Sequence, residues 1–153
     1  MPTLEFQTEI RAPLQAVWDF HNTIETLFRL APPGTQIRLA DPPEPMRAGV
    51  VYRLRIRRWG LVPIHWDARI VEYNPPAGFT DEQVPGRGPF RYWQHQHRFT
   101  PLNEQYTLLT DRVTYEMPLG WLGKAIDHLF VRRDIQQMFA YRHRVTRQAL
   151  EQP

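Results

Sequence analysis

The chain has 153 residues and a formal net charge of +3, with 42% hydrophobic and 23% charged residues, which is typical of one folded domain. It contains no cysteine, so disulfides, thiolate metal sites and cysteine nucleophiles are excluded. No apolar run is long enough to span a membrane and no secretory leader is recognisable, so we expect a single cytoplasmic domain over residues 1–153. The basic residues are dispersed among acidic ones and form no nucleic-acid-binding motif, so we expect no nucleic-acid partner.

The first part of the chain predicts one strand followed by two short helices. Residues 3–10 alternate apolar and polar side chains, which is typical of a half-buried strand. Pro13 then stands where the first turn of a helix favours proline, and a second short helix ends before residues 32–34. His21, near the end of the first helix, is expected to be a surface or capping residue.

The middle of the chain predicts only strands, and its end predicts a helix. The extended segments are residues 35–39, 50–57, 64–73, 79–84, 90–99 and 105–117. From about Leu119 to Leu150 apolar residues recur at helical spacing without a proline. The predicted fold is therefore α+β, a curved antiparallel sheet of about seven strands wrapped around a long C-terminal helix. Such a sheet leaves a cavity against the helix wherever side chains do not fill it.

Polar side chains interrupt the inner faces of the last three predicted strands. Because residues two apart share a strand face, each face mixes polar and large apolar side chains: Phe79, Asp81 and Gln83; Trp93, His95, His97 and Phe99; Leu109, Asp111, Val113 and Tyr115. We expect the hairpin between the last two strands, with its loop near residues 100–104, to place Asp111 opposite His95 and Val113 opposite Trp93. Buried polar groups of this kind must be hydrogen-bonded or solvated.

Arg142 lies within the apolar stripe of the final helix, four residues after Met138. A guanidinium in that place requires a carboxylate, which either Asp81 or Asp111 can supply. Near the start of the same helix, Trp121 is expected to pack against the helix, with the cavity mouth or a membrane surface as alternatives.

Three hypotheses account for the polar inner face. In the first, the polar side chains form a purely structural hydrogen-bond network. In the second, they line a small-molecule pocket. In the third, they form a catalytic or metal site. For chemistry, the candidates are His95 with Asp111 behind it as acid–base pair, and Tyr115 as a donor. His95 and His97 with Asp111 also resemble a two-histidine, one-carboxylate metal face, although we expect neither a metal nor a resident cofactor. The predicted ligand-binding residues are Tyr52, Trp66, Phe79, Asp81, Gln83, Trp93, His95, His97, Asp111, Tyr115, Phe139 and Arg142.

The element order resembles that of the START-like (SRPBCC, Bet v 1-like) superfamily, whose architecture is the helix-grip fold. The resemblance is closest to bacterial stand-alone polyketide cyclase/dehydrase-like domains, and it is carried by Phe79-Thr80-Asp81-Glu82-Gln83, Gly88-Pro89-Phe90, Trp93-x-His95-x-His97-x-Phe99, Thr110-Asp111-Arg112-Val113-x-Tyr115, Pro118-x-Gly120 and Phe139-Ala140-Tyr141-Arg142. It implies a cavity for a hydrophobic ligand such as a lipid, polyketide, sterol or quinone. We therefore expect binding or carriage of such a molecule, with a cyclase- or dehydratase-type enzyme and a partner-binding domain as alternatives.

Overall fold

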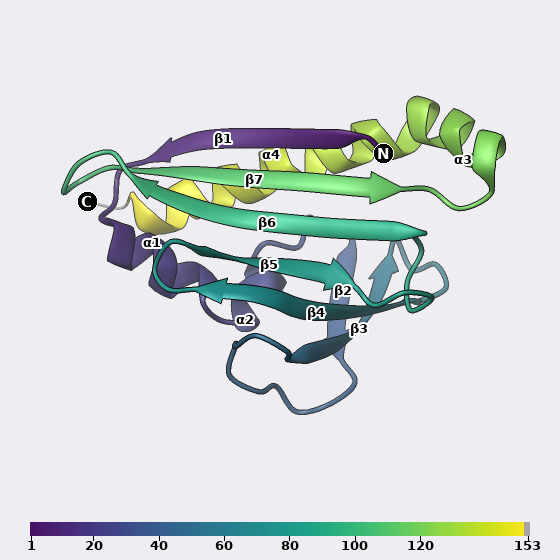
Figure 1. Cartoon of the computed structure of the whole chain (residues 1–153), viewed down its shortest axis with the longest axis horizontal. Coiled ribbons are helices and arrows are strands. Elements are labelled where there is room, and N and C mark those ends of the chain that lie inside the picture. Colours follow the sequence, from purple (N-terminus) through teal and green to yellow (C-terminus); the bar gives the residue numbers. More distant parts are fainter. Residues whose placement is uncertain (152–153) are drawn as a thin grey trace.

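Seven antiparallel strands form one sheet in the computed structural model, which describes residues 1–151 (Figure 1). The strands are β1 (Thr3–Ile10), β2 (Thr35–Leu39), β3 (Val51–Arg58), β4 (Ile64–Asn74), β5 (Gly78–Gln83), β6 (Tyr92–Pro101) and β7 (Thr107–Glu116). Their order in the sheet is β1-β7-β6-β5-β4-β3-β2, so every neighbour pair except β1 and β7 is consecutive in sequence. The predicted antiparallel sheet of about seven strands is confirmed.

Five helical segments pack on one side of this sheet or extend beyond it. They are α1 (Leu14–His21), α2 (Glu25–Arg29), α3 (Gly120–Ile126), the π-helical segment η1 (Asp127–Val131) and α4 (Arg132–Leu150). The last three follow one another without a gap and make up the predicted long C-terminal helix. Figure 1 shows α4 behind β1, β7 and β6, while α1 and α2 lie behind the other half of the sheet. The helix-grip architecture is confirmed.

Two apolar cores hold these layers together. Under α4, Phe139 is fully buried and stacks on Phe6 of β1, with ring centroids 4.8 Å apart. Under α1, Trp18 packs edge-on against Phe79 and Phe99 of the sheet. Burying an aromatic side chain stabilises a fold by roughly 1.5–3 kcal/mol relative to leaving it in water. The space between the two cores is where the polar side chains of the sheet meet the helices.

The pairing of β6 with β7 differs from the prediction by two residues. Asp111 lies opposite His97, and Val113, not Asp111, lies opposite His95. Trp93 faces Tyr115 rather than Val113. The prediction was wrong because the hairpin loop starts later: Pro101 still pairs with Thr107, so the loop is residues 102–106. Because the error is an even number of residues, every side chain keeps its predicted face.

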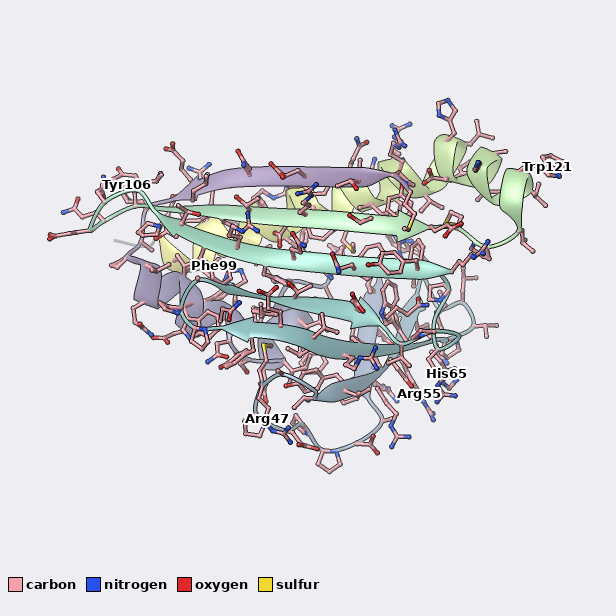
Figure 2. All side chains as sticks on the ribbon, viewed as in Figure 1. Arg47, Arg55, His65, Phe99, Tyr106 and Trp121 are labelled. Carbon is pink, nitrogen blue, oxygen red and sulfur yellow. The ribbon has the colours of Figure 1, made fainter. Side chains whose placement is uncertain are left out.

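The α3–η1 segment carries an exposed apolar surface. Trp121 is 80% exposed and points away from the body of the molecule (Figure 2), so the expectation that it packs against the helix start was wrong. The reason is local. Gly123 is the only buried residue of α3, and the main contacts of α3 are with the adjoining segment η1. Large exposed side chains in this segment are Leu119, Trp121, Leu122, Ile126, Leu129 and Phe130. In the described part of the chain, no helix combines the length and apolarity that crossing a bilayer requires.

Candidate functional site

An interior cavity of about 170 Å³ lies between the sheet and the helices. Its walls are mainly apolar and include Ile24, Leu27, Leu30, Ile37, Met46, Tyr52, Leu54, Ile56, Trp66, Ala68, Ile70, Phe79, Trp93 and Met138. Charged or titratable side chains also line it, namely His21, Asp81, His95, His97 and Arg142. An apolar body with a few convergent polar groups is the usual form of a small-molecule site.

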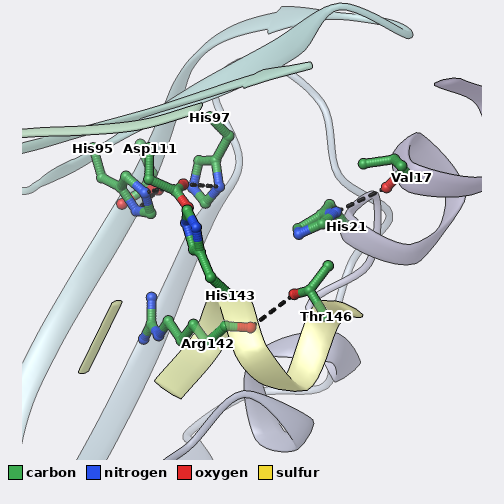
Figure 3. A network of polar contacts seen from close by, with 9 residues as sticks. Val17, His21, His95, His97, Asp111, Arg142, His143 and Thr146 are labelled. Carbon is green, nitrogen blue, oxygen red and sulfur yellow. Dashed lines mark hydrogen bonds and ion pairs between the residues drawn. The ribbon is translucent and has the colours of Figure 1, made fainter. Parts of the chain in front are cut away.

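Two histidines of β6 each hold a carboxylate at the polar side of this cavity. Alternation along the strand turns Trp93, His95 and His97 to the same face. His95 Nε2 lies 2.7 Å from Asp111 Oδ1, and His97 Nε2 lies 2.9 Å from Asp81 Oδ2. Figure 3 shows His95, His97 and Asp111 converging from neighbouring strands. Both histidines thereby have one ring nitrogen fixed by a carboxylate, which fixes the orientation of the ring.

Each imidazole also lies near the other carboxylate. His95 Nδ1 is 3.6 Å from Asp81 Oδ2, and His97 Nδ1 is 3.5 Å from Asp111 Oδ1. The two ring centroids are only 3.7 Å apart. Two imidazoles and two carboxylates thus alternate around a closed ring, in which a proton on either histidine always faces a carboxylate.

His143 of α4 joins the same carboxylate from the helix side. Its Nε2 lies 2.6 Å from Asp111 Oδ2, and its Nδ1 lies 2.7 Å from the Thr8 hydroxyl on β1. Thr8 and His143 also line an outer groove of about 610 Å³ between β1 and α4. We call Asp81, His95, His97, Asp111 and His143 the His–Asp cluster. Hydrogen bonds therefore run from the outer groove, through His143 and Asp111, to His95 at the cavity wall.

Sequence reasoning missed His143, although a signal for it existed. It follows the buried Phe139 by four residues, and Phe139 follows the buried Ile135 by four. A histidine at this spacing lies on the same buried stripe of the helix. The apolar side chains of that stripe were counted, and the polar side chain that continues it was not.

At the two carboxylates of the cluster, burial and the neighbouring histidines act on the pKa in opposite directions, and the histidines prevail. Burial alone raises the pKa of Asp111, but the nearby His95 and the hydrogen bonds from His143 and His95 hold that pKa well below its usual value. Burial also raises the pKa of Asp81, but the hydrogen bond from His97 lowers it by more, so the net pKa of Asp81 is lowered. The pKa of His97 is lowered, chiefly because burial disfavours its charged form. Both carboxylates are therefore ionised at neutral pH.

His21 is a buried cavity residue, so the surface alternative was wrong, whereas its bond to a carbonyl in the last turn of α1 agrees with the capping alternative. Its Nδ1 donates a 2.8 Å hydrogen bond to the carbonyl of Val17, and its ring packs 4.9 Å from that of Phe99. Burial lowers the pKa of His21 to about 4. The surface alternative failed because the end of α1 turns inward over the sheet instead of facing solvent. His21 consequently presents an uncharged imidazole to the cavity at neutral pH.

Arg142 does not form the ion pair that was predicted for it. Among residues 1–151, no carboxylate oxygen lies within 4.0 Å of its guanidinium nitrogens, and its buried Nε has no hydrogen-bond partner. The guanidinium carbon lies 5.3 Å from the centroid of the Phe139 ring. The expected partners are already bonded elsewhere, since Asp81 accepts from His97 and Asp111 accepts from two histidines.

Asp81, His95 and His97 are also arranged as metal ligands can be. One ligand atom from each lies within 4.8 Å of the others, and two imidazoles with one carboxylate suit a divalent transition metal. The carboxylate of this set is Asp81, whereas the sequence suggested Asp111. Asp111 instead stands behind His95 and accepts its Nε2–H, as residues that orient metal-bound histidines do.

The structure brings eight of the twelve predicted ligand-binding residues to the cavity wall: Tyr52, Trp66, Phe79, Asp81, Trp93, His95, His97 and Arg142. The remaining four, Gln83, Asp111, Tyr115 and Phe139, do not line it. Gln83 hydrogen-bonds the backbone N–H and carbonyl of Phe90. The Tyr115 hydroxyl donates to Asp127. These two side chains fix the local structure at the far end of the strands.

Comparison with known proteins gives one family and one fold. A family model described as "Domain of unknown function (DUF8410)" matches residues 8–150. No curated protein sequence matches the chain. Among solved structures, protein CV1439 of Chromobacterium violaceum is similar with a TM-score of 0.76 and 14% identity, over 99% of this chain and 98% of that one.

Two further solved structures have informative names. A START superfamily protein of Mycobacterium smegmatis has a TM-score of 0.68 and 14% identity, over 97% of each chain. Norcoclaurine synthase of Thalictrum flavum, in complex with dopamine and hydroxybenzaldehyde, has a TM-score of 0.69 and 12% identity, over 99% of this chain and 88% of that one. At these identities the likeness shows the START-like fold.

Proposed function

Since the chain belongs to the DUF8410 family and has the START-like fold, we propose that it binds a compact hydrophobic small molecule in the interior cavity. The observation that carries this proposal is an apolar cavity with polar side chains gathered on one side. Such a shape removes apolar ligand surface from water while the polar groups set the orientation of the ligand.

The volume of the cavity favours the smaller ligands among those predicted. A cavity of about 150 Å³ with apolar walls holds a molecule the size of benzene, and the cavity here measures about 170 Å³. This space suits a single aromatic ring or a branched aliphatic group better than an intact sterol or long acyl chain. The norcoclaurine synthase structure of the same fold holds dopamine and hydroxybenzaldehyde, both single-ring compounds, which supports the choice.

A cavity-filling variant tests this proposal. Ala68 lines the cavity from β4, so Ala68→Leu reduces its volume. We expect this variant to weaken the binding of single-ring aromatic compounds at least tenfold, measured by isothermal titration or by quenching of tryptophan fluorescence. The matched control is Ala140→Leu on α4, which is exposed and lines the outer groove. Binding that is lost in Ala140→Leu and retained in Ala68→Leu contradicts the proposal.

A second candidate is acid–base catalysis on the bound molecule. The observation that favours it is the 2.7 Å hydrogen bond between buried His95 and Asp111, because a carboxylate behind an imidazole fixes its tautomer and its orientation. His95 also lines the cavity, so its ring can reach a ligand. The expected result is that His95→Gln abolishes conversion of a bound compound, followed by mass spectrometry, while its Kd changes only a few fold. Equal loss of binding and folding contradicts this role.

A transient membrane contact is proposed for the exposed apolar surface of α3 and η1. Trp121 and Phe130 are 80% and 67% exposed, and the exposed basic side chains Lys124, Arg132 and Arg133 lie in the same stretch. Apolar side chains interleaved with basic ones are typical of helices that rest on anionic lipid surfaces. A hydrophobic ligand released into a membrane, or taken from one, needs such a contact only briefly.

A further inference from the structure

We infer that Arg142 is the receptor for an acidic group, so that the cavity takes a compact hydrophobic carboxylic acid, bound as its anion. This inference rests on the proposed function and specifies the ligand class. Arg142 is the one guanidinium that lines the interior cavity within residues 1–151. Its side chain runs along α4 beneath the histidines, and no contact is drawn at its guanidinium (Figure 3).

The first support is the missing counter-charge. Every other cluster charge already has a bonded partner, as Asp81 has His97 and Asp111 has His95 and His143. Among the charged side chains of residues 1–151 that line the cavity, only the Arg142 guanidinium has no oppositely charged group within 4.0 Å. A partly buried charge without a bonded partner is costly, and charged groups in such surroundings are typical of functional sites.

The second support is the geometry of the donors. The Phe139 ring lies 5.3 Å from the guanidinium carbon, a cation–π contact that restrains the side chain. A guanidinium presents its N–H groups as a planar fork that matches the two oxygens of a carboxylate. A void of about 20 Å³ beside Arg142 has room for one water. A water can satisfy one N–H, but it does not neutralise the charge, so it does not replace an anion.

The His–Asp cluster can accommodate the added negative charge. Asp81 and Asp111 raise the local negative charge, and a carboxylate ligand raises it further. Both carboxylates are already hydrogen-bonded to imidazoles, Asp81 to His97 and Asp111 to His95 and His143, so they do not compete with the ligand for the guanidinium. The apolar walls then contact the hydrophobic part of the acid, and the cavity volume of about 170 Å³ is large enough for a single ring.

Benzoate and benzamide test the inference, because they share their size and shape and differ in charge. We expect wild-type protein to bind benzoate at least about tenfold more tightly, since hydrogen bonds between charged partners are stronger than neutral ones. In Arg142→Met this preference should disappear while benzamide still binds. Arg142→Lys keeps the charge without the planar fork and should show an intermediate preference. The matched control is Arg144→Met, an exposed arginine of the same helix that should leave the preference unchanged.

The outcomes separate the two proposals. Equal affinity of the wild type for both probes overturns the carboxylate inference and leaves the proposed function standing. A preference that persists in Arg142→Met also overturns it, because another group then recognises the acid. Binding of neither probe contradicts both the ligand class and the single-ring binding proposed above. If Arg142→Met is too unstable to titrate, Arg142→Lys decides, since an unchanged preference there contradicts recognition by the guanidinium fork.

Discussion

His95 hydrogen-bonds to Asp111 diagonally across β6 and β7: its Nε2 lies 2.7 Å from Oδ1, although Val113 is the residue directly opposite it. Diagonal neighbours on one sheet face remain within reach of long side chains. This diagonal leaves Asp111 between the two strand histidines and the helix, where it also accepts from His143. One carboxylate thus ties the sheet to α4 inside the molecule.

Replacing Asp111 should therefore destabilise the fold strongly. Asp111→Asn leaves buried imidazoles without their anionic partner, and breaking a buried ion pair in this way costs about 3 kcal/mol or more. The measurement is the free energy of unfolding in urea. Asp134→Asn is the matched control, because its ion pair with Arg58 is roughly half exposed and such pairs contribute about 1 kcal/mol or less. Similar losses in the two variants would mean that the cluster is not structurally coupled.

The pKa of His21 predicts how stability depends on pH. Because burial lowers this pKa to about 4 from an ordinary 6.5, the unfolded chain binds the proton first as pH falls, and stability decreases between about pH 6.5 and 4. The full shift corresponds to roughly 3 kcal/mol. His21→Phe removes this titration, so its unfolding free energy should vary less with pH over that window. Titratable Asp111, His97 and His143 face His21 and remain in the variant, so only the difference from wild type is informative.

Exposed histidines provide the control for that experiment. His65 is exposed on β4, so His65→Phe should leave the pH dependence of stability as it is in the wild type. A wild-type slope that survives in His21→Phe would show that His21 does not cause it and would contradict a lowered pKa of His21 in the folded protein.

Two phenylalanines of the C-terminal helical region should differ sharply in their effect. Phe139 is fully buried and stacks on Phe6, so Phe139→Ala should cost about 3–5 kcal/mol of unfolding free energy. Phe130 is 67% exposed, so Phe130→Ala should change stability by about 0.5 kcal/mol or less. Thermal unfolding followed by circular dichroism compares them. A large loss in Phe130→Ala would indicate that the α3–η1 surface is covered in solution.

The same exposed surface predicts lipid binding. Sedimentation with vesicles of mixed phosphatidylcholine and phosphatidylglycerol should carry down the wild-type protein, and less of Trp121→Ser, because the exposed indole then no longer inserts at the interface. Binding should also fall with added salt, since part of it is electrostatic. His65→Phe again serves as an unrelated surface change. No sedimentation of wild type with anionic vesicles would contradict the proposed membrane contact.

Gly78 should be irreplaceable for a reason that Gly86 does not share. Both have positive φ, but a Cβ on Gly78 would lie 2.0 Å from the carbonyl oxygen of His97, whereas one on Gly86 meets open space. Gly86→Ala should therefore cost about 1–2 kcal/mol from its backbone conformation alone. Gly78→Ala should cost clearly more and weaken ligand binding, because it displaces the strand that carries His97. Equal costs would refute the steric argument.

Sequence patterns predicted the strands and their faces well because alternation is a local property. Residues 3–10 and the inward face of His95 and His97 follow directly from it. The register of β6 on β7 was missed because it depends on where the hairpin loop begins, which the residues 100–106 do not fix by composition. The absence of an ion pair at Arg142 was missed for a different reason. Sequence shows that a carboxylate is near, but not that histidines already bind both Asp81 and Asp111.

His143 shows the limit most clearly. From sequence alone, a polar residue within an apolar helix stripe looks like an interruption of the buried face. Here that residue, His143, hydrogen-bonds α4 to two strands of the sheet. Only the three-dimensional approach of Thr8 and Asp111 to the same imidazole gives it a role. No pairwise sequence spacing connects these residues, which are 135 and 32 positions from it.

The place of β1 at the edge of the sheet, beside β7, has a consequence for how the protein reaches this structure. Thr3 pairs with Thr114, which is 111 positions away. During synthesis the first strand cannot pair until the last strand, β7, has been made, and contacts so distant in sequence make folding slow. Until they form, β7 offers an open row of N–H and carbonyl groups to any other extended chain. Nascent and partly unfolded molecules should therefore be the ones that depend on chaperones, and β7 is where they should aggregate.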